Sequence, residues 1–191
     1  MKIVAVKTTI LVLILSVLSL SSVYSSENQI STNSSKNKQL RDELKGVDGK
    51  KAMEIANEWR LKKIDIVTFV TPDTVNFKFK DGETISIPVP DDIMIVSIAP
   101  YVNKTHKCAT HYMSSCDAEL KNEDMKITAF TAGGKILINK TMKTGPTGFL
   151  DLWLPRNQEI DIAVSAKGKN ATGKIYTYRN SKTCDTTLKL E

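Results

Sequence analysis

The feature that most constrains the fold is a change in the spacing of apolar residues near Ile64. Between Asp48 and Lys62 the apolar positions recur every three or four residues, which is typical of a helix with one buried face. From Ile64 onward they alternate with polar positions, in the stretches IDIVTFV, TVNFKFK and ETISIPV. Such alternation predicts strands that bury one face. We therefore expect a small helical part followed by sheet.

The helix is predicted to begin at Asp48, whose short acidic side chain suits an N-cap, and to run to about Lys62. Trp59 is expected to anchor its buried face in the core. A shorter helix is predicted from Lys38 to Lys45, ending at Gly46. The buried face of the longer helix is formed by Ala52, Ile55, Ala56 and Trp59.

Turn signals divide the rest of the chain into short strands. Asp81-Gly82 is a strong two-residue hairpin signal, and Pro88 and Pro90 indicate an edge strand or a crossing between sheets. After Glu123, further alternating stretches are separated by glycine-containing turns, a spacing typical of a β-sandwich. The predicted fold class is α+β, with a small N-terminal helix plus antiparallel strands and a C-terminal all-β, sandwich-like domain.

The N-terminus predicts export. Residues 1–25 combine two lysines, the apolar run TTILVLILSVLSL and small polar residues, which is the order of a secretory signal peptide. The run is shorter than the roughly 20 residues that span a bilayer, so we expect cleavage near Ser25 and no membrane anchor afterwards. Residues 26–37 are rich in Ser and Asn and are predicted to be a disordered leader. The remaining chain divides into an N-terminal α+β domain (38–100) and a C-terminal β domain (101–191).

Charge excludes one large class of function. Removing residues 1–25 takes away two lysines and no acidic residue, so the formal net charge falls from +6 to +4. The basic residues are scattered singly or in pairs, whereas nucleic-acid-binding proteins gather them on one face or along one helix. We predict no nucleic-acid partner and a soluble exported protein.

Chemistry-bearing residues gather at residues 105–116, THKCATHYMSSC. This segment holds both histidines of the chain (His106 and His111) and two of its three cysteines (Cys108 and Cys116). A disulfide needs Cα atoms within about 7 Å, and ligands of one metal must converge as closely. The two cysteines therefore cooperate only if the chain folds back between them, near residues 110–113. The third cysteine, Cys184, would have to join them from the last strand.

Three interpretations of this segment stay open on the residues alone. One is a structural disulfide with a buried, inert third cysteine, because three cysteines cannot all pair within one chain. Another is a copper site, since thiolate, thioether and imidazole suit monovalent copper, and a thiol pair beside copper could also reduce the divalent ion. The third is a zinc site, which this spacing neither selects nor excludes. The signatures of a serine hydrolase and of a thioredoxin-like enzyme are absent from the sequence.

The residues also carry a resemblance. The motif H-x-C-x2-H-Y-M-S-S-C, the following Glu119-Leu120, the stretch GFLDLWLP and the terminal SKTCDTTLKL resemble the CueP family of exported bacterial copper-binding proteins. The resemblance implies a metal site built from the residues Cys108, Cys116, Cys184, His106 and His111. Which histidine binds directly is left open. Met113 is a candidate additional ligand, although a core methionine is the favoured interpretation.

The resemblance also implies a function. The protein is expected to lie in the periplasm and to serve copper tolerance there. It is expected to hold copper as Cu(I) and to hand it to a partner such as a periplasmic copper, zinc superoxide dismutase. It is expected to form a homodimer through its N-terminal part. Thiol-coupled reduction of Cu(II), with a redox disulfide among the three cysteines, is a second hypothesis, which leaves open whether the protein is an enzyme. The alternative is a secreted β protein with a structural disulfide, or a zinc-binding protein that transfers no copper.

Overall fold

The computed structural model describes residues 35–191. The predicted signal peptide and most of the predicted leader lie outside the described residues. Two compact units divide the chain, Met1–Gly46 and Val47–Glu191. In the first unit residues 35–43 form a helix, so residues 35–37 are helical where the sequence predicted leader. Within residues 35–191 no helix is both long and apolar enough to cross a membrane.

Helix α2 (Gly49–Leu61) confirms the predicted helix and its cap. The Asp48 side chain accepts a hydrogen bond from the backbone N–H of Lys51 at 2.8 Å, which satisfies one of the free donors of the first turn. Trp59 is buried, and its ring lies 5.2 Å from that of Phe77 in an edge-to-face contact. All four residues predicted to form the buried face are buried: Ala52, Ile55, Ala56 and Trp59.

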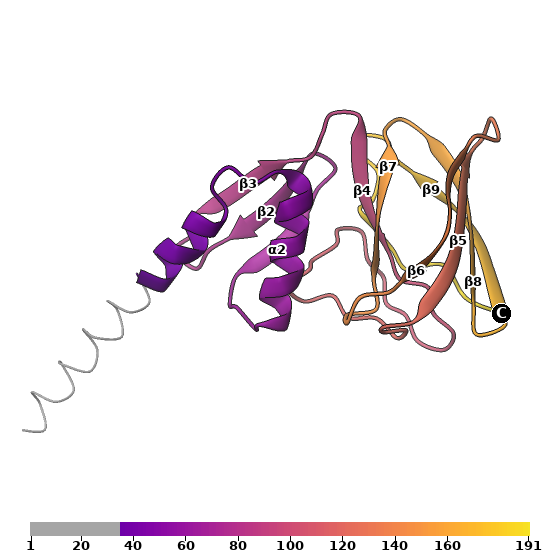
Figure 1. Cartoon of the computed structure of the whole chain (residues 1–191), viewed down its shortest axis with the longest axis horizontal. Coiled ribbons are helices and arrows are strands. Elements are labelled where there is room, and N and C mark those ends of the chain that lie inside the picture. Colours follow the sequence, from indigo (N-terminus) through magenta and orange to yellow (C-terminus); the bar gives the residue numbers. More distant parts are fainter. Residues whose placement is uncertain (1–34) are drawn as a thin grey trace, which may run out of the picture. The chain divides into compact units, whose positions relative to one another are not determined.

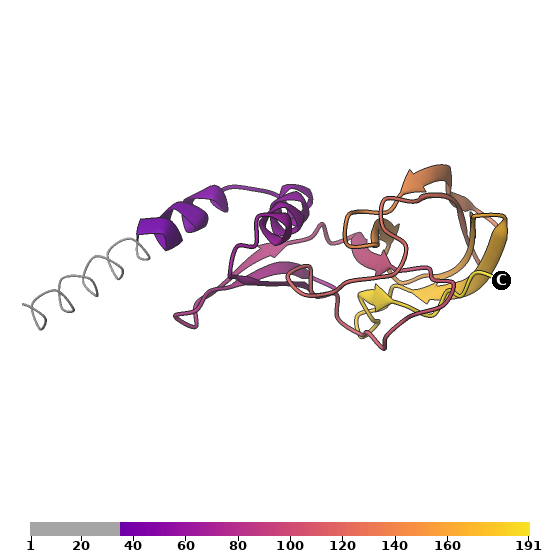
Figure 2. The ribbon, with the colours of Figure 1, turned by 90° about the horizontal axis from the view of Figure 1, so that it is seen from below.

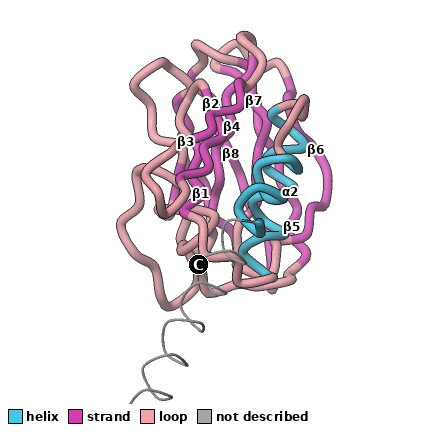
Figure 3. The backbone as a smooth tube through the Cα atoms, turned by 90° about the vertical axis from the view of Figure 1, so that its left-hand side faces the viewer, coloured by secondary structure: helices cyan, strands magenta, loops and turns pink. Residues whose placement is uncertain are grey.

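The first sheet lies beside α2 (Figures 1 and 3). Its antiparallel strands, β1 (Val67–Val70), β2 (Thr74–Lys78) and β3 (Thr84–Pro88), follow one another in chain order. The predicted hairpin at Asp81-Gly82 is present, but it is longer than two residues, because the N–H of Phe79 donates to the carbonyl of Glu83. Pro88 ends the edge strand β3, in agreement with the edge or crossing that the prolines indicated.

Two further sheets form the sandwich (Figures 1 and 2). The three-stranded sheet has the order β10-β4-β7 and the four-stranded sheet the order β6-β5-β8-β9. Between them lies the largest core cluster, which includes Val96, Leu152, Ile127 and Ile162. The strands are β4 (Ile93–Ile98), β5 (Asp124–Thr131), β6 (Ile136–Lys143), β7 (Leu150–Pro155), β8 (Glu159–Ala166), β9 (Lys169–Tyr176) and β10 (Cys184–Asp185).

Strand β4 joins the two parts of the sequence. It precedes residue 101, where the C-terminal domain was predicted to begin, yet it pairs antiparallel with β7 and parallel with β10. The predicted boundary itself stays a prediction. Strand β10 starts at Cys184, as expected, and places the third cysteine at the edge of this sheet. The α+β fold class with a sandwich-like C-terminal part is confirmed.

Candidate metal centre

The sheet β10-β4-β7 has two faces with different surroundings. Val96 and Ile98 point into the sandwich core. Successive residues of a strand point to opposite faces, and residues paired in register share a face. Ser97 pairs with both Cys184 and Asp151, so these three side chains form a row across the outer face. The hydroxyl of Ser97 donates to the Asp151 carboxylate at 2.5 Å.

An apolar cluster lies on the same face. Phe149 precedes Asp151 by two residues, and it packs with Ala99 and Cys184 in a core cluster separate from that of the sandwich. The partly buried Cys108 and Cys116 pack against this cluster. We call Ser97, Ala99, Phe149, Asp151 and Cys184 the site floor.

Residues 105–116 cross the site floor as an irregular segment. Its chain reverses at a tight turn, in which the N–H groups of Ser115 and Cys116 donate to the carbonyl of Tyr112 at 3.1 and 2.8 Å. The N–H of Val70 in β1 donates to the carbonyl of His111 at 3.0 Å. The segment thus extends the free edge of the first sheet and covers the site floor on the sheet β10-β4-β7. The chain reversal required by the cysteine spacing is present.

The structure brings the three cysteines together. Cys108 and Cys184 form a disulfide with their Cα atoms 5.6 Å apart. Cys116 is free and half-buried, and its Sγ lies 3.9 Å from the Sγ of Cys108. Burial raises the pKa of the Cys116 thiol, while a backbone N–H of Tyr112 and the charge of Arg60 oppose that rise. The two sulfurs of residues 108 and 116 are therefore near enough for one metal ion or for thiol–disulfide exchange.

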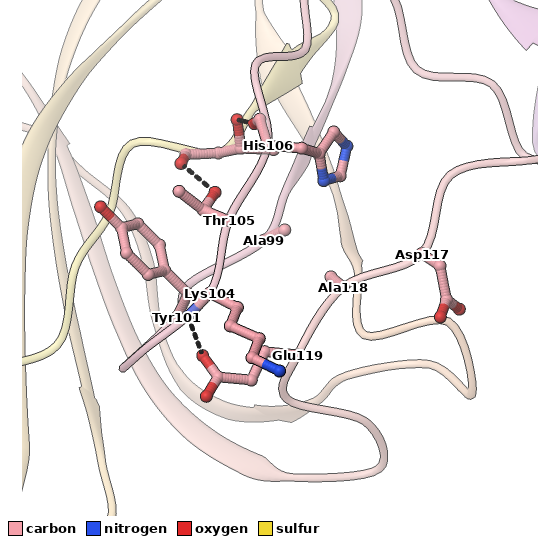
Figure 4. A pocket seen from close by; sticks show the side chains of 9 residues that line it. Ala99, Tyr101, Lys104, Thr105, His106, Asp117, Ala118 and Glu119 are labelled. Carbon is pink, nitrogen blue, oxygen red and sulfur yellow. Dashed lines mark hydrogen bonds between the residues drawn. The ribbon is translucent and has the colours of Figure 1, made fainter.

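His106 is the histidine that joins the sulfurs. One ring nitrogen of His106 and the sulfurs of Cys108 and Cys116 all lie within 4.8 Å of one another. The ring is exposed, on the wall of a 290 Å³ pocket whose other side carries Glu119 (Figure 4). A second pocket, of 730 Å³, is lined by both His106 and Cys108. His106 and Cys108 therefore both border space that is open to solvent.

His111 lies deeper. It is 2% exposed, and its ring is centred 4.4 Å from that of Phe149. Burial lowers its pKa; the negative charge of Asp151 opposes this and the neighbouring His106 adds to it. Its Nδ1 has no hydrogen-bond partner among the described residues. A buried nitrogen of this kind is costly to leave unsatisfied, and a neutral imidazole keeps one lone pair for a metal ion. His111 is not part of the group of three that surrounds Cys108.

Met113 is 1% exposed and belongs to the buried core, in agreement with the favoured interpretation of it as a core residue. Glu119, in contrast, organises the chain next to His106. Its carboxylate accepts from the N–H groups of Val102, Asn103 and Lys104 at 2.8–3.1 Å, and these bonds lower its pKa to about 2. Glu119 thereby holds the start of the segment that carries the candidate ligands.

Sequence reasoning missed the polar residues that surround these ligands. Asp151 and Ser97 enter the site only through strand register, which the sequence does not reveal. The signals available were an acidic residue inside the apolar stretch FLDLWL and the threonines that flank Cys184 in KTCDTT.

Comparisons with known proteins found one matching family and a similar solved structure. The model of the family described as periplasmic copper-binding protein CueP matches residues 51–189. A solved structure, described as the crystal structure of S.CueP, is similar to this fold with a TM-score of 0.73 and 27% sequence identity. That similarity covers 79% of this chain and 93% of the other. None of the curated proteins matches the sequence.

Proposed function

The chain belongs to the CueP family of periplasmic copper-binding proteins, and from that premise we propose that it holds Cu(I) at the cysteine–histidine cluster to provide copper tolerance. One observation carries the proposal. The ligand atoms of His106, Cys108 and Cys116 converge within 4.8 Å, and Cys184 is bonded to Cys108. Residues far apart in the chain thus supply sulfur and imidazole to one place.

The donor set fits monovalent copper. Thiolate and imidazole are soft or borderline ligands that favour Cu(I) over hard cations. His106 is exposed and Cys116 is half-buried, whereas the buried His111 has a ring nitrogen without a hydrogen-bond partner among the described residues and is a candidate further ligand. Cys108 and Cys184 are thiolate ligands only when their disulfide is reduced, so we infer that the reduced protein is the copper-binding form.

The same geometry supports a coupled redox step as part of the proposal. Two thiolates, those of Cys108 and Cys184, each give one electron to a Cu(II) ion, which yields two Cu(I) ions and the disulfide. A thiol reductant then returns two electrons to the disulfide. Under this hypothesis one reduced protein reduces two Cu(II) ions and then stops. Further turnover needs the external thiol.

Delivery and assembly belong to the proposal as well. We infer that copper, zinc superoxide dismutase or a similar periplasmic protein receives the ion, and that the protein is a homodimer. Both inferences are supported by the resemblance of the HxCxxHYMSSC and SKTCDTTLKL motifs to the family.

A structural disulfide is the competing function, and the bond between Cys108 and Cys184 favours it. Zinc binding by the same donors is a further alternative. In the first case the reduced protein would not compete with a chelator for Cu(I); in the second, zinc would bind at least as well as copper.

The test is a titration of the reduced, mature protein under anaerobic conditions with Cu(I) against a chromophoric chelator, in parallel with zinc and with Cys184→Ser. We expect Cu(I) to bind far more tightly than zinc and Cys184→Ser to lose that affinity. If Cys184→Ser binds like the parent, a shared site of three cysteines is wrong.

A further inference from the structure

The two threonines that flank Cys184 bind the segment that carries both histidines. Thr183 and Thr186 are 2% and 6% exposed, although neither is a metal ligand by chemistry. Buried hydroxyls are kept only where their hydrogen bonds are made. We call this pair the threonine bracket, and its partners show what it holds.

Thr183 forms hydrogen bonds to the part of the segment 105–116 that contains His111. Its hydroxyl donates to the carbonyl of Val70 at 2.8 Å and accepts from the N–H of His111 at 3.1 Å. Its own N–H donates to the carbonyl of Ala109 at 3.0 Å, and its carbonyl accepts from the N–H of Ser97 at 2.9 Å. One residue therefore connects β1, the ligand-bearing segment and β4.

Thr186 ties the His106 side. Its hydroxyl donates to the carbonyl of His106 at 2.5 Å, and its carbonyl accepts from the hydroxyl of Thr105 at 2.8 Å. Each histidine of the segment is thus bound through its backbone to one threonine, with Cys184 between the two threonines in sequence.

These bonds matter most when the disulfide is open. Strand β10 has only two residues, and its pairing beside Cys184 consists of the backbone bonds from Ser97 and Ala99 to residues 183 and 185. Reduction removes the covalent connection between residues 76 positions apart. The hydrogen bonds of the bracket are formed by hydroxyl and backbone groups and need no bond between the two sulfurs.

We propose that Thr183 and Thr186 are positioning residues that preorganise the thiols and histidines of the reduced protein. This inference rests on the proposed function for its copper consequence, but not for its effect on the thiols. Preorganisation raises affinity by lowering the ordering cost at binding. The same preorganisation raises the effective concentration of one thiol at the other.

The first experiment measures the thiol–disulfide equilibrium of Cys108 and Cys184 against mixtures of reduced and oxidised glutathione. It uses a Cys116→Ser background, in which no other pair can form. The test variant is Thr183→Val, which keeps the shape and removes the hydroxyl. Thr183→Ser keeps the hydroxyl and is the conservative rescue.

Thr177→Val is the matched control. Thr177 is 1% exposed; its hydroxyl donates to the carbonyl of Pro155 at 2.8 Å and accepts from the N–H of Gln158 at 3.0 Å. Its hydroxyl therefore makes the same two kinds of hydrogen bond as that of Thr183, one donated to a carbonyl and one accepted from a backbone N–H, but in a turn of the sandwich. Both valine variants should lose similar global stability, so stability alone cannot separate them.

We expect Thr183→Val to shift the equilibrium toward the dithiol by about tenfold, the effect of two lost hydrogen bonds, while Thr183→Ser and Thr177→Val stay near the parent. If Thr183→Val shifts no more than Thr177→Val, the bracket does not position the thiols. Should Thr183→Val fail to fold, Thr186→Val with Thr186→Ser replaces it under the same two criteria.

The second experiment measures Cu(I) affinity of the reduced variants with Cys116 retained. The bracket predicts weaker binding at unchanged stoichiometry in Thr183→Val, with rescue by Thr183→Ser. Equal affinities in all variants would overturn the copper part of the inference. A parent protein that does not bind Cu(I) would instead refute the proposed function, and the glutathione equilibrium would still decide whether the bracket acts.

Discussion

One face of the sheet β10-β4-β7 packs Val96, Ile98 and Leu152 into the sandwich core, while the other presents Cys184 and Asp151 to the segment 105–116. The inner face is held by a large apolar core. The outer face is held by a small apolar cluster around Phe149, by one disulfide and by hydrogen bonds between particular side chains and backbone groups. The difference teaches that the fold should survive changes to the site, and that the site should respond to changes that hardly affect the fold.

Reduction of the disulfide should give the largest effect on the outer face. Opening a bond between residues 76 positions apart should lower the free energy of unfolding by about 4 kcal/mol, mainly because the unfolded chain regains entropy. Urea unfolding of the oxidised and reduced parent protein measures this loss. A reduced protein as stable as the oxidised one would mean that the bond adds no constraint to the unfolded chain.

Leu152→Ala tests the inner face. The side chain is 1% exposed in the sandwich core, so its truncation should cost about 3 kcal/mol of unfolding free energy. The Cu(I) affinity of the folded variant should nevertheless equal that of the parent. A matching loss of copper affinity would show that the two faces are not independent.

Asp151→Asn sharpens the comparison from the polar side of the floor. Loss of the charge-assisted bond from Ser97 should cost about 1–2 kcal/mol of unfolding free energy. Since the Asp151 charge opposes the lowering of the His111 pKa, the variant should lower that pKa further. NMR titration of the His111 ring in the metal-free protein checks the direction. A raised pKa would contradict the assignment of Asp151 as the neighbouring charge.

Glu119→Gln should give the smallest effect, one that is present near neutral pH and disappears in acid. Backbone N–H groups lower the pKa of Glu119 to about 2, below its value in an unfolded chain. A lowered folded pKa contributes stability above the unfolded pKa, and this contribution is lost as the pH falls toward 2. The parent should therefore lose stability more steeply than Glu119→Gln between about pH 5 and pH 2. Parallel curves from urea titrations across this range would refute the assignment.

The fold was largely predictable because its signals are local. The capped helix α2, with Trp59 buried, follows from apolar spacing and from Asp48. Local signals were less exact for the ends of helices and strands. The first helix includes residues 35–37, which were predicted to be leader, and the turn at Asp81-Gly82 is longer than its two-residue signature. The pairing of β4 with β7 and β10 was not predictable, since strand order depends on contacts between distant residues.

The candidate site divides in the same way. The segment 105–116 stood out because rare residues gather there, and the need for a chain reversal followed from spacing alone. The sequence could not reveal which cysteines pair, because the long chain between them and the last strand lets either Cys108 or Cys116 reach Cys184. Asp151 and the threonine bracket were hidden for a similar reason: their roles come from strand register and from hydrogen bonds to backbone atoms.

The central claim is that all three cysteines contribute to one copper site. The most direct test is copper X-ray absorption of the Cu(I)-loaded, reduced protein and of Cys184→Ser at equal, substoichiometric loading. The account predicts a sulfur-rich copper shell that loses one sulfur neighbour in Cys184→Ser. An unchanged shell would place Cys184 outside the site and leave its bond to Cys108 as a structural disulfide.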